Sequence, residues 1–159
     1  MKDFANEMTK QFWKRIEDVR AGMLHTDDTR IVPMSGYPDS DENAIWFITA
    51  DGADAYEAAV AGRETSFIVS DASAKIYARV HGSLSAVNDQ AKLDELWSPV
   101  ASAWFKDGRE DSSVRLVRLT PKKAEVWLTD GGAGFLYEVA KANLTEQTAD
   151  AGEHGVITF

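Results

Sequence analysis

The chain has 159 residues, 44% of them hydrophobic and 27% charged, a balance typical of one globular domain that buries its own core. The formal net charge is −9, and an acidic surface of this kind repels nucleic-acid phosphates, so we expect no nucleic-acid partner. Cysteine is absent, which excludes disulfides and thiolate chemistry, and no apolar run reaches the length of a membrane-spanning helix.

The first ten residues are polar and lack the apolar stretch of a signal peptide, so we expect a cytoplasmic protein with no membrane partner. The three histidines, His25, His81 and His154, show no spacing typical of metal ligands. We therefore predict no metal site.

A helix is predicted over residues 9–20, with Thr9 as its N-cap, because Phe12, Ile16 and Val19 recur on one face. We expect two short strands next, at residues 23–26 and 29–34, which form a hairpin. A polar loop is expected after them, at residues 35–43.

The run from Ala44 to Thr49 is continuously apolar and rich in aromatic and β-branched residues, which predicts a strand buried on both faces. A short helix is expected after it, at residues 54–61, and two further strands follow at residues 65–70 and 75–87. Gly82 lies inside the longer of these strands, where it predicts a β-bulge or a sharp bend.

The C-terminal half opens with a predicted helix over residues 88–97, which Pro99 interrupts, and a further helical turn to Phe105. After a charged loop, the last two strands are expected at residues 114–119 and 124–128, with a turn at Thr120-Pro121 between them. Beyond them we expect a glycine hinge, a short helix and a loosely ordered polar tail, at residues 131–134, 135–143 and from Thr145 onward.

Most neighbouring strands are joined by connections too short for a parallel crossover, so the sheet is predicted to be antiparallel. About seven such strands with helices at the edges indicate an α+β fold that is mainly antiparallel β, namely a β-barrel with flanking helices.

Seven segments occur in an order and spacing that resemble one known family. They are residues 12–19 (FWKRIEDV), 32–34 (VPM) and 46–49 (WFIT), Gly82, and residues 93–97 (LDELW), 104–108 (WFKDG) and 116–127 (LVRLTPKKAEVW). Across residues 9–128 the chain resembles the general stress protein 26 group of the pyridoxamine 5′-phosphate oxidase-like flavoproteins. The resemblance implies that residues 1–159 form one split β-barrel domain. It also implies a homodimer that holds FMN between its subunits, with FAD as the alternative cofactor.

The resemblance further implies which side chains contact the flavin. Family members place an Arg-Pro-Met segment and a Trp-Phe-x-Thr strand along the flavin, and aromatic residues of the C-terminal half complete the site. The matching residues are Pro33, Met34, Phe47, Ile48, Thr49, Trp104 and Trp127, together with Arg30, where some members carry an additional arginine.

Two positions depart from the family pattern. Val32 stands where an arginine precedes the Pro-Met pair, and Ala55 stands where a lysine contacts the phosphate. Losing two charge-assisted hydrogen bonds weakens phosphate binding by roughly a hundredfold or more. The cations that could replace them are Arg30, Arg63, Lys75 and Arg79.

The candidate residues also have purely structural interpretations. Thr49 could end a buried strand, and Arg30 could keep a strand edge polar. Trp104 and Trp127 could fill the barrel or a dimer interface instead of stacking on a flavin ring.

The leading hypothesis from the resemblance is an FMN-binding, stress-related flavoprotein with oxidoreductase activity on an unknown substrate. No catalytic residue is identifiable from the sequence. The alternative is a non-enzymatic flavin-binding or sensor dimer with a degenerate cofactor site, which Val32 and Ala55 favour. A third hypothesis is haem or metal binding through His25 or His81.

Overall fold

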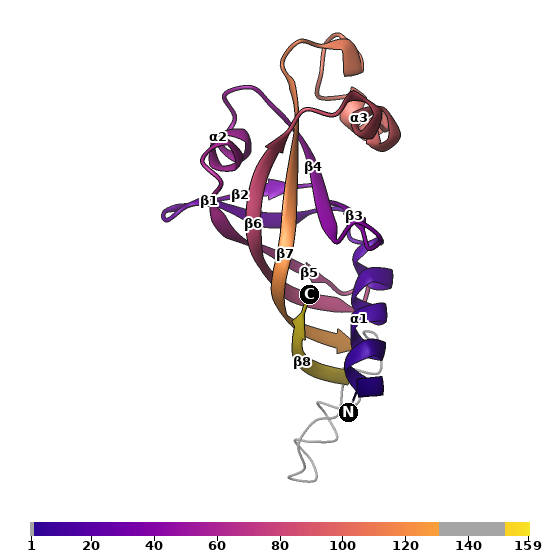
Figure 1. Ribbon diagram of the computed structural model, residues 1–159. Coiled ribbons are helices and arrows are strands. Elements are labelled where there is room, and N and C mark those ends of the chain that lie inside the picture. The colour runs from indigo at the N-terminus through magenta and orange to yellow at the C-terminus, as the bar shows by residue number, and fades with distance from the viewer. Residues whose placement is uncertain (1, 131–151) are drawn as a thin grey trace.

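The computed structural model describes residues 2–130 and 152–159 (Figure 1). The helices are α1 (Lys2–Ile16), α2 (Asp54–Val60), α3 (Gln90–Leu96) and α4 (Pro99–Ser102), with a 3₁₀ turn η1 (Gly108–Glu110). The strands are β1 (Gly22–Asp27), β2 (Arg30–Met34), β3 (Tyr37–Asp39), β4 (Ala44–Ala50), β5 (Glu64–Asp71), β6 (Ile76–Val87), β7 (Val114–Thr129) and β8 (Gly152–Thr158). None of these helices is long and apolar enough to cross a membrane.

The strands form one antiparallel sheet in the order β2-β1-β5-β6-β7-β4-β3, and β8 also pairs with β7. The two edge strands, β2 and β3, follow one another in the chain and are separated only by Ser35 and Gly36. This short connection holds the two edges of the sheet near each other, so the sheet curls into a barrel, with α2 and α3 beside its upper part in Figure 1. The antiparallel barrel with flanking helices that the sequence predicts is confirmed.

Strand β7 is continuous over sixteen residues, and the turn predicted at Thr120-Pro121 is wrong. The first part of β7 pairs with β4, and the last part pairs with β8. On its other side, β7 pairs with the whole length of β6. Pro121 lies opposite Gly82, where the β6–β7 register shifts. Because the ladder is already interrupted at this bulge, the missing N–H of a proline is tolerated inside a long strand.

Gly82 occupies the bulge that the sequence predicts. A Cβ atom at this position would lie 2.2 Å from the carbonyl oxygen of Thr120 and 2.9 Å from the Cα of Pro121. Both are backbone atoms of the neighbouring strand, so the close approach of β6 and β7 at the bulge requires a residue without a side chain.

Helix α1 begins at Lys2, about two turns earlier than residues 9–20 suggest, and it ends at Ile16. Met8 extends the buried face of Phe12 and Ile16 by one turn, and it is only 2% exposed. The predicted N-cap, Thr9, therefore lies inside the helix. Helices are stabilised mostly by burial of an apolar face, so this packing sets the helix start more strongly than a single capping residue.

Two strands arise where the sequence indicates loop or tail. β3 lies in the predicted polar loop 35–43, and β8 lies in the predicted loosely ordered tail. The ring of Phe159, at the end of β8, packs edge-on against Phe12 and Trp13 with centroid separations of 5.3 and 5.6 Å. The predicted glycine hinge and the helix over 135–143 lie outside the described residues.

The barrel interior holds the principal core. Side chains of β1, β4, β5, β6, β7 and β8 meet there, and the α1 side chains Met8, Phe12 and Ile16 pack against them. A smaller cluster, with Trp46 and Leu116 fully or nearly buried, lies on the outer side of β4 and β7, where Leu96 of α3 packs on it. The second cluster joins α3 to the outside of the barrel.

Candidate functional site

A pocket of about 510 Å³ lies where the end of β2, the end of β4 and the segment around α4 meet. β3 runs antiparallel to β4, with Tyr37 opposite Trp46. The residues just before β3 are therefore brought beside the last residues of β4. The lining consists of Ala21, Pro33, Met34, Ser35, Tyr37, Ile48, Thr49, Ala50, Ala101, Trp104 and Phe105. Its volume falls within the range of small-molecule sites.

The pocket walls are apolar and aromatic, with three hydroxyl groups and no charged side chain. Ser35, Tyr37 and Thr49 supply the hydroxyls, each of which can both donate and accept a hydrogen bond. The Tyr37 hydroxyl lies 3.4 Å from the Ser98 hydroxyl, just before α4. Trp104 is 80% exposed and so forms the outer rim. Such a surface suits a flat, largely apolar molecule with a few polar edge atoms.

Five of the eight residues predicted to contact a flavin line this one pocket: Pro33, Met34, Ile48, Thr49 and Trp104. They come from three separate parts of the chain, and the fold brings them together. Thr49 is 8% exposed, so its hydroxyl group is held near the pocket wall by the surrounding core.

The other three predicted residues lie elsewhere. Phe47 is completely buried inside the barrel, where its ring meets that of Phe67 edge-on at 5.1 Å. Trp127, on the β8-paired part of β7, stacks flat on His154 at 4.7 Å and is 39% exposed. Arg30, the first residue of β2, forms an ion pair with Asp54 of α2.

Sequence reasoning missed several pocket residues. Ser35 and Tyr37 lie in the segment expected to be a polar loop, and Phe105 closes the expected helical turn. An aromatic hydroxyl inside an otherwise small and polar segment is the signal that could have singled out Tyr37. Ala21, Ala50 and Ala101 carry no such signal, because alanine is common in any wall.

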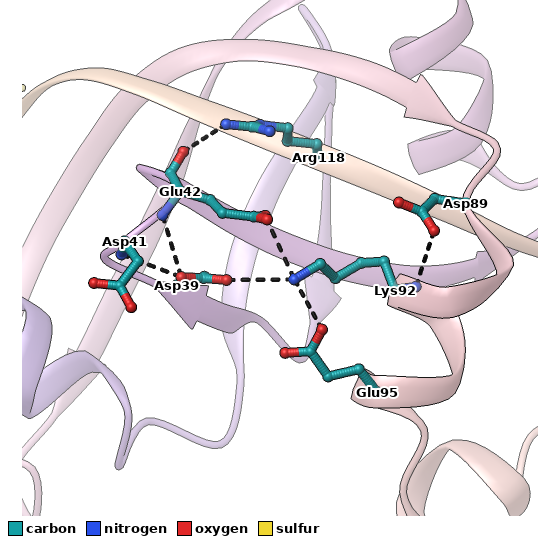
Figure 2. A network of polar contacts seen from close by, with 7 residues as sticks. All are labelled: Asp39, Asp41, Glu42, Asp89, Lys92, Glu95 and Arg118. Carbon is teal, nitrogen blue, oxygen red and sulfur yellow. Dashed lines mark hydrogen bonds and ion pairs between the residues drawn. The ribbon is translucent and has the colours of Figure 1, made fainter.

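Helix α3, which precedes α4 in the chain, is tied to the barrel through Lys92 (Figure 2). The Lys92 ammonium lies 3.4 Å from Asp39, 3.4 Å from Glu42 and 3.0 Å from Glu95. Asp39 and Glu42 belong to the β3–β4 hairpin, so these ion pairs fix α3 to the same hairpin that carries Tyr37. Hydrogen bonding to Glu95 and attraction to the other carboxylates raise the pKa of Lys92, against the opposing effect of burial.

The ring of Trp46 lies close to two cations of this network. The Lys92 ammonium is 5.5 Å from the ring centroid and the Arg118 guanidinium is 5.3 Å from it, both within cation–π range. Arg118 also donates a hydrogen bond to the Glu42 carbonyl at 2.6 Å. After α3, the Trp97 indole donates to the Ser102 hydroxyl at 2.9 Å, which holds α4 against the end of α3.

The histidines lie outside the pocket. The ring of His81 is 3.0 Å from Glu64, and the ring of His154 is 3.0 Å from Glu125. Within residues 2–130 and 152–159, no group of three or more His, Asp or Glu side chains is arranged to hold a metal ion. The hypothesis of haem binding through His25 or His81 stays a prediction.

Comparison with known proteins identifies relatives of the whole chain. Residues 7–150 match the family described as pyridoxamine 5′-phosphate oxidase like. The crystal structure of a general stress protein 26 from Jannaschia sp. CCS1 is 46% identical, covers 97% of this chain and 99% of that chain, and has a TM-score of 0.85. The general stress FMN/FAD binding protein from Xanthomonas citri is 29% identical, covers 80% and 92% of the two chains, and has a TM-score of 0.70.

A more distant structure, the FAD binding protein from Mycobacterium smegmatis, shares the fold at 20% identity and a TM-score of 0.51, over 74% of this chain and 90% of that chain. Comparison with curated proteins found no match. The family match spans most of the chain, and a relative with 46% identity covers nearly all of it. As the spacing of its motifs predicts, the chain belongs to the pyridoxamine 5′-phosphate oxidase-like family of split β-barrels.

Proposed function

We propose that this chain is a flavin-binding protein of the general stress type and that its pocket holds the flavin ring. One observation carries the proposal: five residues that match the family's flavin-contacting motifs converge on a single pocket from three parts of the chain. The relative from Xanthomonas citri, described as an FMN/FAD binding protein, supports it independently. FMN is the proposed cofactor, with FAD as the alternative.

The residues present fit the ring part of a flavin. Met34 and Ile48 offer apolar contact, and Trp104 offers a large aromatic face at the rim. The hydroxyls of Ser35, Tyr37 and Thr49 can bond to the polar edge of the ring in either direction. A bound flavin would supply hydride or electron transfer, and the protein would orient the ring and exclude water from one side of it.

No His, Lys, Arg, Asp or Glu is among the residues that line the pocket. A proton needed during flavin reduction would come from water or from one of the three pocket hydroxyl groups. The second candidate function is a non-enzymatic flavin-binding or sensor protein. It is favoured by the departures from the family pattern at Val32 and Ala55.

The homodimer and the cytoplasmic location stay predictions, as does one split-barrel domain over residues 1–159. The predicted role of Trp127 at the flavin depends on the predicted homodimer. Trp127 lies on the barrel exterior outside the pocket of its own chain, so we propose that it reaches a flavin only as a residue of the partner subunit.

The experiment that tests the proposed function is the visible absorption spectrum of the purified protein, followed by titration of stripped protein with FMN. We expect flavin absorption, and quenching of flavin fluorescence on titration. Trp104→Ala should weaken the quenching and leave the unfolding midpoint unchanged. A protein that ignores every flavin offered would refute the proposal. Bleaching by NAD(P)H would separate an oxidoreductase from a carrier.

A further inference from the structure

The lining of the pocket suits an uncharged ring and offers no cation for a doubly charged phosphate. We infer that it recognises the isoalloxazine ring alone, so that riboflavin, FMN and FAD bind with affinities within about tenfold of one another. This inference rests on the proposed function, and it names the ligand class that the pocket accepts: flavins with or without a phosphate. None of the residues that line the pocket is charged.

The arginines at the strand ends and beside α2 are already paired with carboxylates. Arg30 is held by Asp54. Arg63 contacts Asp28 at 2.6 Å. Each carboxylate offsets part of the charge of its arginine, so a phosphate there would gain less attraction than at an unpaired guanidinium.

Arg115, opposite Thr49 in the β4–β7 ladder, is held more firmly still. Its guanidinium lies 3.4 Å from Asp51 and donates to the carbonyls of Ser112 and Val114 at 2.8 and 2.9 Å. It also lies over the Tyr56 ring at 5.5 Å. These contacts tie Arg115 to the barrel end, where it lines a second pocket and not the one proposed for the flavin ring.

The segment that follows the β4 wall is acidic. Asp51, Asp54 and Glu57 stand within and just before the first turn of α2. These carboxylates interact favourably with the positive N-terminal end of α2, and they repel a ligand phosphate at the same place. The net charge of −9 acts in the same direction over the whole molecule.

Two exposed cations adjoin the pocket in sequence. Arg20 precedes Ala21, and Lys106 follows Phe105. An exposed ion pair typically contributes less than about fivefold to an equilibrium, whereas one charge-assisted hydrogen bond in a built site contributes about tenfold to a hundredfold. We therefore expect Arg20 and Lys106 to add little to any preference for FMN.

The experiment is a titration of stripped protein with riboflavin, FMN and FAD, followed by flavin fluorescence at low and at high ionic strength. We expect dissociation constants within about tenfold of one another, and FMN binding that stays constant or tightens as salt screens the acidic surface. FMN binding more than about tenfold tighter than riboflavin, and weakening with salt, would overturn the inference while leaving the proposed function intact. Failure of all three flavins to bind would overturn both.

Matched variants assign any phosphate contact to a residue. Arg30→Gln, and the double change Arg20→Gln with Lys106→Gln, should leave the ratio of FMN to riboflavin affinity within about threefold of the wild-type ratio. Trp104→Ala should weaken the binding of FMN and of riboflavin by the same factor. A selective loss of FMN affinity of more than about tenfold in either variant would place a phosphate contact at the substituted side chains and overturn the inference.

Discussion

Replacing Lys92 with methionine tests how the α3–α4 wall is attached to the barrel. The Lys92 side chain is 10% exposed, and its three carboxylate partners, Asp39, Glu42 and Glu95, are 25%, 43% and 63% exposed. Removing one member of a fully buried ion pair costs about 3–5 kcal/mol, and a surface pair contributes about 0–1 kcal/mol. Because water can solvate the orphaned carboxylates only in part, we expect Lys92→Met to lower the free energy of unfolding by about 2 kcal/mol.

For a chain of this length, that loss lowers the melting temperature by roughly 4–8 °C, which calorimetry or thermal circular dichroism resolves readily. Methionine keeps most of the apolar stem that packs on Trp46, so the change isolates the charge. Glu95→Gln is the matched control. It removes the most exposed partner and leaves Lys92 paired with Asp39 and Glu42, so the cost should stay below about 1 kcal/mol. A Lys92→Met variant that melts at or above the wild-type temperature would refute the reasoning.

The pH dependence of the Lys92 effect has a definite sign. Its carboxylate partners raise the pKa of Lys92 above the ordinary value of 10.5. A raised pKa on a basic group means that its stabilisation is complete below that ordinary value and is lost as the pH rises through the folded-state value. The stability difference between wild type and Lys92→Met should therefore stay constant near neutrality and shrink only in strongly alkaline buffer.

Three further changes probe the bulge, the rim and one surface cluster. Gly82→Ala puts a Cβ atom 2.2 Å from the Thr120 carbonyl oxygen, so urea unfolding should show a loss of about 1–3 kcal/mol. Trp104→Ala should change stability by less than about 0.5 kcal/mol, because the side chain is 80% exposed, yet it should weaken flavin binding measurably in the fluorescence titration. Hydrogen bonding to Lys122 lowers the pKa of Glu64, so the stabilisation is present above the ordinary carboxyl value of 4.5 and lost on acidification. A pH series of unfolding midpoints should thus show wild type above Glu64→Gln at neutral pH and the two converging in acid.

Controls for these changes come from the same chain. Gly155→Ala meets only the flexible sulfur end of Met8, at 2.9 Å, so it should cost less than Gly82→Ala. If both glycine variants lose equal stability, the backbone clash at the bulge is not the cause. Equal stability of wild type and Glu64→Gln at all pH values would contradict the ion-pair account of Glu64, and unchanged flavin affinity in Trp104→Ala would remove that ring from the site.

The positions of most strands could be predicted from local sequence, and five of the pocket residues could be predicted from the family motifs. The apolar run from Ala44, the glycine at position 82 and the Asp89 cap of α3 each act through local chemistry that the sequence displays, and Asp89 indeed accepts a hydrogen bond from the Lys92 amide at 3.0 Å. What local sequence could not show is decided by distant partners. Pro121 indicates a turn when its own segment is considered alone, and it fits a continuous strand because it faces the bulge at Gly82.

The C-terminal strand is the clearest case of such a distant partner. Val156 and Ile157 have strand-forming side chains, but they are too few to indicate a strand until β7 offers an edge and α1 offers Phe12 as a packing partner for Phe159. The candidate site shows the same limit. The family motifs indicate that Thr49 and Trp104 contact the same ligand, whereas the pairing of Arg30 with a carboxylate appears only in three dimensions.

The crystal structure of the protein grown with riboflavin or FMN tests the central claim most directly. We predict ring density against Met34, Ile48 and Trp104, within reach of the Thr49 hydroxyl, and a ribityl chain that leads away from the pocket without a cationic partner for its phosphate. Ring density at any other place on the barrel, or a phosphate clasped by Arg30 after release of Asp54, would contradict the account.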